Sequence, residues 1–138
     1  MTQEFYALGS NRSADVVRGF LHHFLPDREP CCADYPVPEG SNAPRCVLRA
    51  ESEVLDYMEQ NPSEPYGLYW NDAGSSSAQA MVFYTRDGHV IFGLALETTE
   101  PAKKLTELAG LVGATYSTLG SEQRPPDTAA AFIALCSV

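Results

Sequence analysis

The chain has few basic residues. Its 138 residues include 9 Lys and Arg against 18 Asp and Glu, which gives a net charge of −9. Binding to nucleic acid needs clustered Lys and Arg to meet the phosphates, so this composition predicts no nucleic-acid partner. It argues in the same way against docking on an anionic membrane. The acidic surplus instead favours either simple solvation or a basic protein partner.

Long apolar runs and targeting signals are also missing. No segment approaches the length of a membrane-spanning helix. The opening MTQEFYALGS lacks the basic and apolar regions of a signal peptide, so we expect a cytoplasmic protein. The chain length and the hydrophobic content of 44% predict a single folded domain over residues 1–138.

Motifs that carry chemistry are absent as well. No phosphate loop, dinucleotide fingerprint or G-x-S-x-G serine motif occurs. Two His on a helix bind one metal ion at i, i+4 spacing, but His22 and His23 are adjacent. The adjacent Cys31 and Cys32 are interpreted as reduced thiols, with a redox or metal role as the alternative. We predict no metal, no cofactor and no enzymatic activity.

Apolar spacing and capping residues predict four helices, at about 13–24, 51–60, 101–112 and 128–136. Strand-like segments lie at about 4–9, 45–50, 66–72, 78–85, 89–97 and 115–120. Residues 26–44 contain five prolines and no periodicity, which predicts a long Pro-rich loop. This order predicts an α+β domain with a largely antiparallel sheet flanked by about four helices.

The segment VFYTRDGHVIFGLALE, residues 82–97, predicts a central hairpin. The Asp87-Gly88 pair favours a two-residue turn. Such a turn would place Phe83 opposite Phe92 and Met81 opposite Leu94. Both faces of this hairpin are mostly apolar, so the sheet is either covered on both sides or uses one side for binding. We interpret the neighbouring His89 as a turn residue and not as a general base.

A run of acids without bases is the most prominent feature. No Lys or Arg occurs from Ala50 to Thr85, and aromatic residues of the kind that anchor interfaces follow the acids. A solvated acidic face is the alternative interpretation, and core packing is the alternative for Trp70. The predicted partner-binding residues are Glu51, Glu53, Asp56, Glu59, Tyr66, Tyr69, Trp70, Asp72, Asp34 and Tyr35.

Three segments carry a resemblance to a known family: FLPDREP…DYPVPE, PYGLYWND…AMVFYTRDGHVIFGLALE and LTELAGLVGATYSTLGSEQRPPDTAAAF. Together they resemble small acidic immunity proteins of bacterial toxin systems related to type VI secretion. The resemblance implies a protein that binds a cognate toxin and blocks its active site. The toxin would be a basic domain, such as a nucleotide- or nucleic-acid-modifying enzyme.

The motifs of the resemblance are structural, so they identify no contact residue. We expect a monomer or a small homo-oligomer. The alternative function is a small-molecule-binding α+β domain, or an enzyme that uses carboxylates and His89.

Overall fold

The computed structural model describes residues 2–74, 76–120 and 123–136. The predicted α+β class is confirmed, and the described chain forms a single α+β domain. Its elements are β1 (Thr2–Gly9), α1 (Ala14–Phe24), β2 (Arg28–Pro30), β3 (Tyr35–Val37), β4 (Cys46–Leu48), α2 (Glu51–Gln60), β5 (Tyr66–Asp72), β6 (Gln79–Tyr84), β7 (Val90–Glu97), α3 (Pro101–Val112), β8 (Ser117–Leu119) and α4 (Ala129–Cys136).

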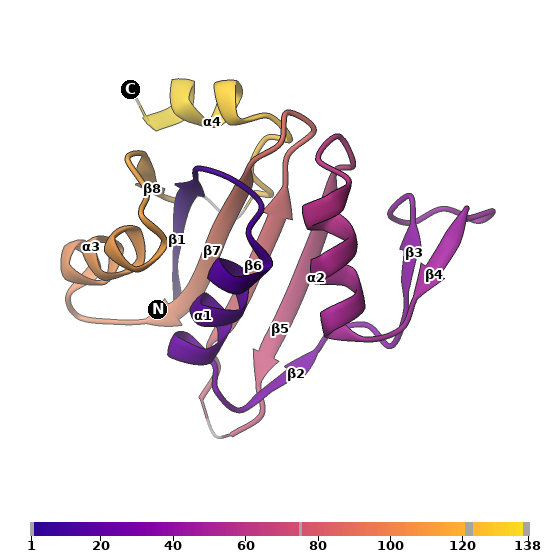
Figure 1. Ribbon diagram of the computed structural model, residues 1–138. Helices are drawn as coiled ribbons and strands as arrows, with labels where there is room; N and C mark the ends of the chain where they lie inside the picture. The colour runs from indigo at the N-terminus through magenta and orange to yellow at the C-terminus, as the bar shows by residue number, and fades with distance from the viewer. Residues whose placement is uncertain (1, 75, 121–122, 137–138) are drawn as a thin grey trace.

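A six-stranded sheet forms the centre of the molecule, with strand order β2-β5-β6-β7-β1-β8 (Figure 1). All its neighbouring strands are antiparallel, as predicted. The central hairpin β6–β7 lies in the middle of the sheet, and the short strands β2 and β8 form its two edges.

The Pro-rich segment departs from the prediction of a loop throughout 26–44. It contains β2 and β3, and β3 pairs with β4 in a separate two-stranded sheet that projects from the body (Figure 1). These strands have only three residues each, which is too short for a periodic pattern to reveal them. We call the hairpin Tyr35–Leu48 the arm.

Local signals explain the helix boundaries. The Ser13 hydroxyl accepts a hydrogen bond from the Val16 N–H at 3.3 Å and so caps α1. Pro101 occupies the first turn of α3, where its missing N–H costs nothing. Gly113 ends this helix in a left-handed conformation, with φ of 67°, which glycine adopts without steric strain.

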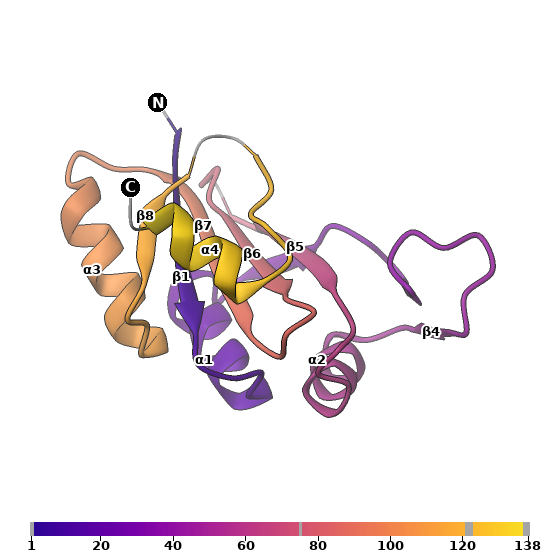
Figure 2. The ribbon, with the colours of Figure 1, turned by 90° about the horizontal axis from the view of Figure 1, so that it is seen from above.

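Helices cover both faces of the sheet. On one face, α1, α2 and α3 enclose the larger core, which contains Phe5, Phe20, Leu55, Trp70, Phe92 and Leu108 among others. On the other face, α4 covers a smaller core of Tyr6, Leu8, Met81, Phe83, Ile91, Ala95, Ala129 and Phe132. Figure 2 shows α1 and α2 on one side of the sheet, with α4 away from them. The second apolar face of the hairpin is therefore largely filled by α4.

The predicted register of the hairpin is wrong by one residue. Phe83 pairs with Ile91, and Phe92 pairs with Val82. The loop has three residues, 86–88, because the Thr85 N–H donates to the His89 carbonyl at 3.0 Å. Gly88 takes a positive φ of 88° at the end of this loop. A three-residue loop of this kind shifts the pairing by one residue and reverses the face of every later side chain.

A contact with α4 accompanies this turn. Both carboxylate oxygens of Asp87 accept the Ala129 N–H at 2.9 Å, and the Thr128 hydroxyl accepts the Ala131 N–H at 3.2 Å. Asp127, two residues before α4, forms an ion pair with Arg86 of the hairpin loop. The hairpin turn and the start of α4 are therefore held together.

Candidate functional site

Three of the predicted partner-binding aromatics lie in the core. Trp70 is 0% exposed, Tyr66 is 3% exposed and Tyr35 is 6% exposed. Their side chains fill space between the sheet and its neighbours, so they are removed from the candidate surface. Tyr69 is half-buried on the other face, where its ring meets that of Phe83 edge-on at a centroid distance of 5.5 Å.

Glu51, at the start of α2, binds side chains of β2 and β5 at this edge of the sheet. Its carboxylate accepts two hydrogen bonds from the Arg28 guanidinium, at 3.0 and 2.7 Å. The same carboxylate accepts the indole N–H of Trp70 at 3.0 Å. Hydrogen bonding to Glu51 raises the pKa of Arg28. Because these bonds satisfy a buried indole and a partly buried guanidinium, Glu51 has a structural role.

The remaining acids of α2 point outward. Glu53, Asp56 and Glu59 are all exposed. Asp56 pairs with Arg18 of α1 at 2.9 Å, and Glu53 accepts the backbone N–H of Arg49 at 3.0 Å. Glu59 forms no ion pair with a base in the part of the chain that the structure describes.

All nine Lys and Arg side chains are engaged within the molecule. Eight form ion pairs with carboxylates: Arg18 with Asp15 and Asp56, Arg28 with Glu51, Arg45 with Glu64, Arg49 with Asp34, Arg86 with Asp127, Lys103 with Glu100, Lys104 with Glu107, and Arg124 with Glu39. The ninth, Arg12, binds backbone carbonyls. The chain therefore leaves no basic side chain to neutralise its surplus acids.

The unneutralised acids gather near β2 and α2. Within residues 2–74, five carboxylates lie there without an ion pair to a described base, and we call them the acidic surface: Asp27, Glu29, Glu53, Glu59 and Asp72. Asp72 lies opposite Arg28 across the β2–β5 pair. The predicted Asp34 lies outside this surface, because Arg49 neutralises it at 2.9 Å.

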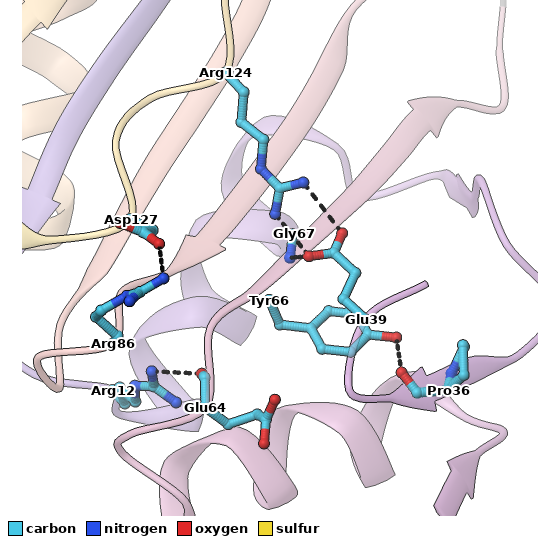
Figure 3. Close-up of polar contacts among 9 residues, drawn as sticks. All are labelled: Arg12, Pro36, Glu39, Glu64, Tyr66, Gly67, Arg86, Arg124 and Asp127. Atoms are coloured by element: carbon cyan, nitrogen blue, oxygen red, sulfur yellow. Dashed lines mark hydrogen bonds and ion pairs between the residues drawn. The ribbon is translucent and has the colours of Figure 1, made fainter. Parts of the chain in front are cut away.

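Polar contacts fix the base of the arm. The Tyr66 hydroxyl donates to the Pro36 carbonyl at 2.7 Å (Figure 3). Burial raises the pKa of Tyr66 to about 12, so this hydroxyl stays a donor. Arg45 pairs with Glu64 at 2.6 Å, and its N–H donates to the Val37 carbonyl at 2.8 Å.

A second contact joins the arm to the C-terminal segment. Arg124 donates to Glu39 at 2.7 and 3.3 Å, while Glu39 also accepts the Gly67 N–H at 3.0 Å (Figure 3). A Cβ at position 67 would lie 2.5 Å from the Arg124 guanidinium, so Gly67 leaves room for this pair. Sequence reasoning missed these residues, because Arg124 and Glu39 are 85 positions apart.

Arg12 is a second residue that sequence reasoning missed. It is 4% exposed and donates to the carbonyls of Met58, Asn61 and Glu64 at 2.7–3.0 Å, and to that of Thr85. Met58 and Asn61 lie at the end of α2, where helical carbonyls lack partners. Burial lowers the pKa of Arg12, and its guanidinium joins α2 to the central hairpin.

Two of the histidines have hydrogen-bond partners in other parts of the fold. The N–H of His89 donates to the Thr85 hydroxyl at 2.9 Å, and its Nδ1 lies 3.2 Å from the Gly9 carbonyl. His23 borders a hollow of about 650 Å³ between α1 and α3, where it lies 2.8 Å from Glu107. The hydrogen bond from His23 lowers the pKa of Glu107.

Comparisons with known proteins add no relative: no family model, no curated protein and no solved structure matches this chain. None of the helices described in residues 2–136 is long and apolar enough to cross a membrane. The described residues also contain no cluster of three or more His, Cys, Asp or Glu side chains that could hold a metal ion.

Proposed function

We propose that this chain is a cytoplasmic immunity protein that binds a basic toxin domain and blocks the active site of that toxin. The observation that carries the proposal is the complete internal use of the bases: eight of the nine pair with acids and Arg12 is buried on carbonyls. The surplus negative charge is therefore available to a partner.

The acidic surface gives this proposal a location. The unpaired Glu53 and Glu59 lie on the exposed side of α2, and Asp56 between them is paired with Arg18. Lys and Arg of a partner would neutralise the two unpaired carboxylates. Charge complementarity of this kind mainly speeds the encounter and suppresses wrong partners. A toxin that binds nucleotides or nucleic acid carries such bases in its active site, because they hold phosphate.

The arm supports the proposal by its shape. It projects beyond the sheet (Figure 1), and contacts from Tyr66, Arg45 and Arg124 hold its backbone. A projecting segment that is already ordered loses little conformational entropy on entering a concave site. Its Glu39 side chain, which Arg124 neutralises, helps to hold the arm in place.

The test is co-expression with a basic toxin domain, taken from a neighbouring gene if one encodes it. We expect a stable complex and protection of the host cell from growth arrest. The double variant Glu53→Gln/Glu59→Gln should lower the association rate several-fold at low salt, and by less at high salt.

A matched control keeps the net charge equal. Ala102→Lys/Thr106→Lys adds two positive charges on exposed positions of α3, and the glutamine pair removes two negative ones. The control should associate at the wild-type rate. Absence of both complex and protection would contradict the proposal. If both variants slow association with the toxin equally, the acidic surface is not the toxin-binding site.

A further inference from the structure

The β8 edge of the sheet is open on its outer side. Tyr116 and Gly120 form backbone hydrogen bonds with β1, at 3.0 and 2.8 Å. Backbone groups of an antiparallel strand alternate between its two sides. The N–H and C=O groups of Ser117 and Leu119 therefore point away from β1. No strand lies on that side among the residues that the structure describes.

Strand β8 itself lacks the features that normally prevent strands from pairing between molecules. Proteins protect free edges with charged side chains, proline or bulges. The opposite edge strand, β2, has the sequence Arg28-Glu29-Pro30 and so carries both charges and a proline. The segment 108–120, which includes β8, contains no charged residue and no proline, and neither does 128–136.

Exposed apolar side chains surround the same edge. Six large apolar residues of the described chain are more than a third exposed, and four of them lie in or next to β8, α3 or α4: Leu111 of α3, Tyr116 just before β8, Leu119 of β8 and Leu135 of α4. Leu119 and Leu135 line one hollow of about 230 Å³. Leu119 is 52% exposed and Leu135 is 55% exposed.

We propose that two copies of this chain pair through β8 and join their sheets into one. The occupant is a second copy because the pairing is self-complementary: a two-fold axis normal to the sheet and midway between the two Thr118 residues places Ser117 opposite Leu119 of the second copy. Each of these residues then exchanges both backbone hydrogen bonds with its counterpart. The same axis brings α3 beside α3 and α4 beside α4, which covers Leu111 and Leu135.

Charge also restricts the approach of a second copy to this edge. Two molecules with a net charge of −9 repel one another, and the repulsion is smallest where the facing segments, such as 108–120, carry no charge. The contact is small, since β8 has only three residues. Small interfaces give weak association, so we expect a reversible dimer.

Analytical ultracentrifugation of the full chain, from about 1 μM to about 1 mM, tests this. The weight-average mass should rise from 15.0 kDa toward twice that value. Leu119→Lys should keep the protein monomeric. Val47→Lys makes the same charge change at an apolar residue that is 37% exposed on the arm, and it should dimerise like the wild type.

Amide exchange measured by NMR provides a second readout that needs no variant. The N–H groups of Ser117 and Leu119 should exchange slowly at high concentration and at least tenfold faster on dilution, whereas that of Thr118, which bonds to β1, should change little. A mass of 15.0 kDa at the highest concentration overturns the proposal. A dimer that tolerates Leu119→Lys, or unchanged exchange at both residues, also overturns it.

Discussion

The two ends of the sheet differ in chemistry. At the β2 end, polar contacts hold the structure: Glu51 binds Arg28 and Trp70, and Arg124 binds Glu39 of the arm. At the β8 end, apolar side chains from α3 and α4 do so, and no charge occurs in 108–120. One sheet can therefore present two surfaces that favour different kinds of partner.

The two ends therefore suit the two proposed interactions, toxin binding at the acidic surface and pairing of two copies through β8. The acidic surface attracts a basic partner and repels a second copy of the chain, because like charges face each other there. Strand β8 itself, Ser117–Leu119, carries no charge to attract a basic toxin. Since β2 and β8 are at opposite edges, a dimer through β8 leaves both arms accessible (Figure 1). Four variants test how far the two ends really differ.

Phe132→Ala should have the largest effect on stability, at the β8 end. Phe132 is 1% exposed and anchors α4 on the smaller core. Truncation of a buried Phe costs about 3–5 kcal/mol, because it loses apolar contact and leaves a cavity. Urea denaturation measures the loss, which should be independent of salt.

The exposed neighbour Leu135 provides the control for Phe132. Leu135→Ala should cost less than about 1 kcal/mol in the monomer, since 55% of this residue is already exposed. A similar cost for both variants would show that α4 is not anchored by Phe132.

Glu51→Ala should have the next largest effect, at the β2 end. It leaves the Arg28 guanidinium and the Trp70 indole N–H without their acceptor. An unsatisfied buried donor costs about 1–3 kcal/mol. Urea denaturation followed by the fluorescence of the single Trp should show this loss. Glu59→Ala, on the exposed side of α2, should leave the midpoint unchanged; an equal shift for both would contradict the role given to Glu51.

Gly67→Ala should have a smaller effect that is confined to the arm. The added Cβ would lie 2.5 Å from Arg124 Nη2, so the guanidinium must move away from Glu39. Because a flexible side chain can move, we expect a loss of about 1 kcal/mol. Amide exchange in 40–45 should speed up while exchange in β8 stays constant.

The control for Gly67 is Gly19→Ala in α1, where a new Cβ meets nothing within 4 Å. It should stabilise the protein by about 0.5–1 kcal/mol. Unchanged exchange in the arm of the Gly67 variant would show that the Glu39–Arg124 pair does not hold it.

Local sequence signals predicted most of the fold. Apolar spacing in α1 and the Pro101 and Gly113 pair in α3 are properties of neighbouring residues, so helix positions could be found without the structure. The order of helices and hairpins then indicated an antiparallel α+β sheet. The same local reasoning failed for the register of the hairpin, because Asp87-Gly88 fits both a two-residue turn and the observed three-residue loop.

The candidate site was less predictable, because long-range contacts determine it. The acids of 51–72 looked unneutralised in sequence, but Arg28 and Arg45 reach Glu51 and Glu64 from outside that window. Trp70 matches an interface anchor in composition and yet lies in the core. No local pattern shows which carboxylate meets a distant guanidinium, so only part of the acidic run remains as the acidic surface.

Asp87→Asn should have the smallest effect at neutral pH and a specific effect in acid. Partial burial opposes ionisation of Asp87, but hydrogen bonds from Thr85 and the Ala129 N–H outweigh it and lower the pKa of this carboxyl below the ordinary 3.8. The unfolded chain then binds the proton more readily, so the carboxylate stabilises the fold above pH 3.8 and this stabilisation is lost as the pH falls through the folded pKa.

Asn keeps an oxygen acceptor for the Ala129 N–H but cannot titrate. Between about pH 4 and pH 2, below the ordinary pKa of an Asp carboxyl, the variant should therefore lose less stability than the wild type. Thermal unfolding at a series of pH values measures this slope. Glu59→Gln removes a carboxylate at the β2 end that has no described ion-pair partner, and it should keep the wild-type slope. If Asp87→Asn also keeps that slope, its hydrogen bond to α4 contributes nothing in solution, and the β8 end is held by apolar contacts alone.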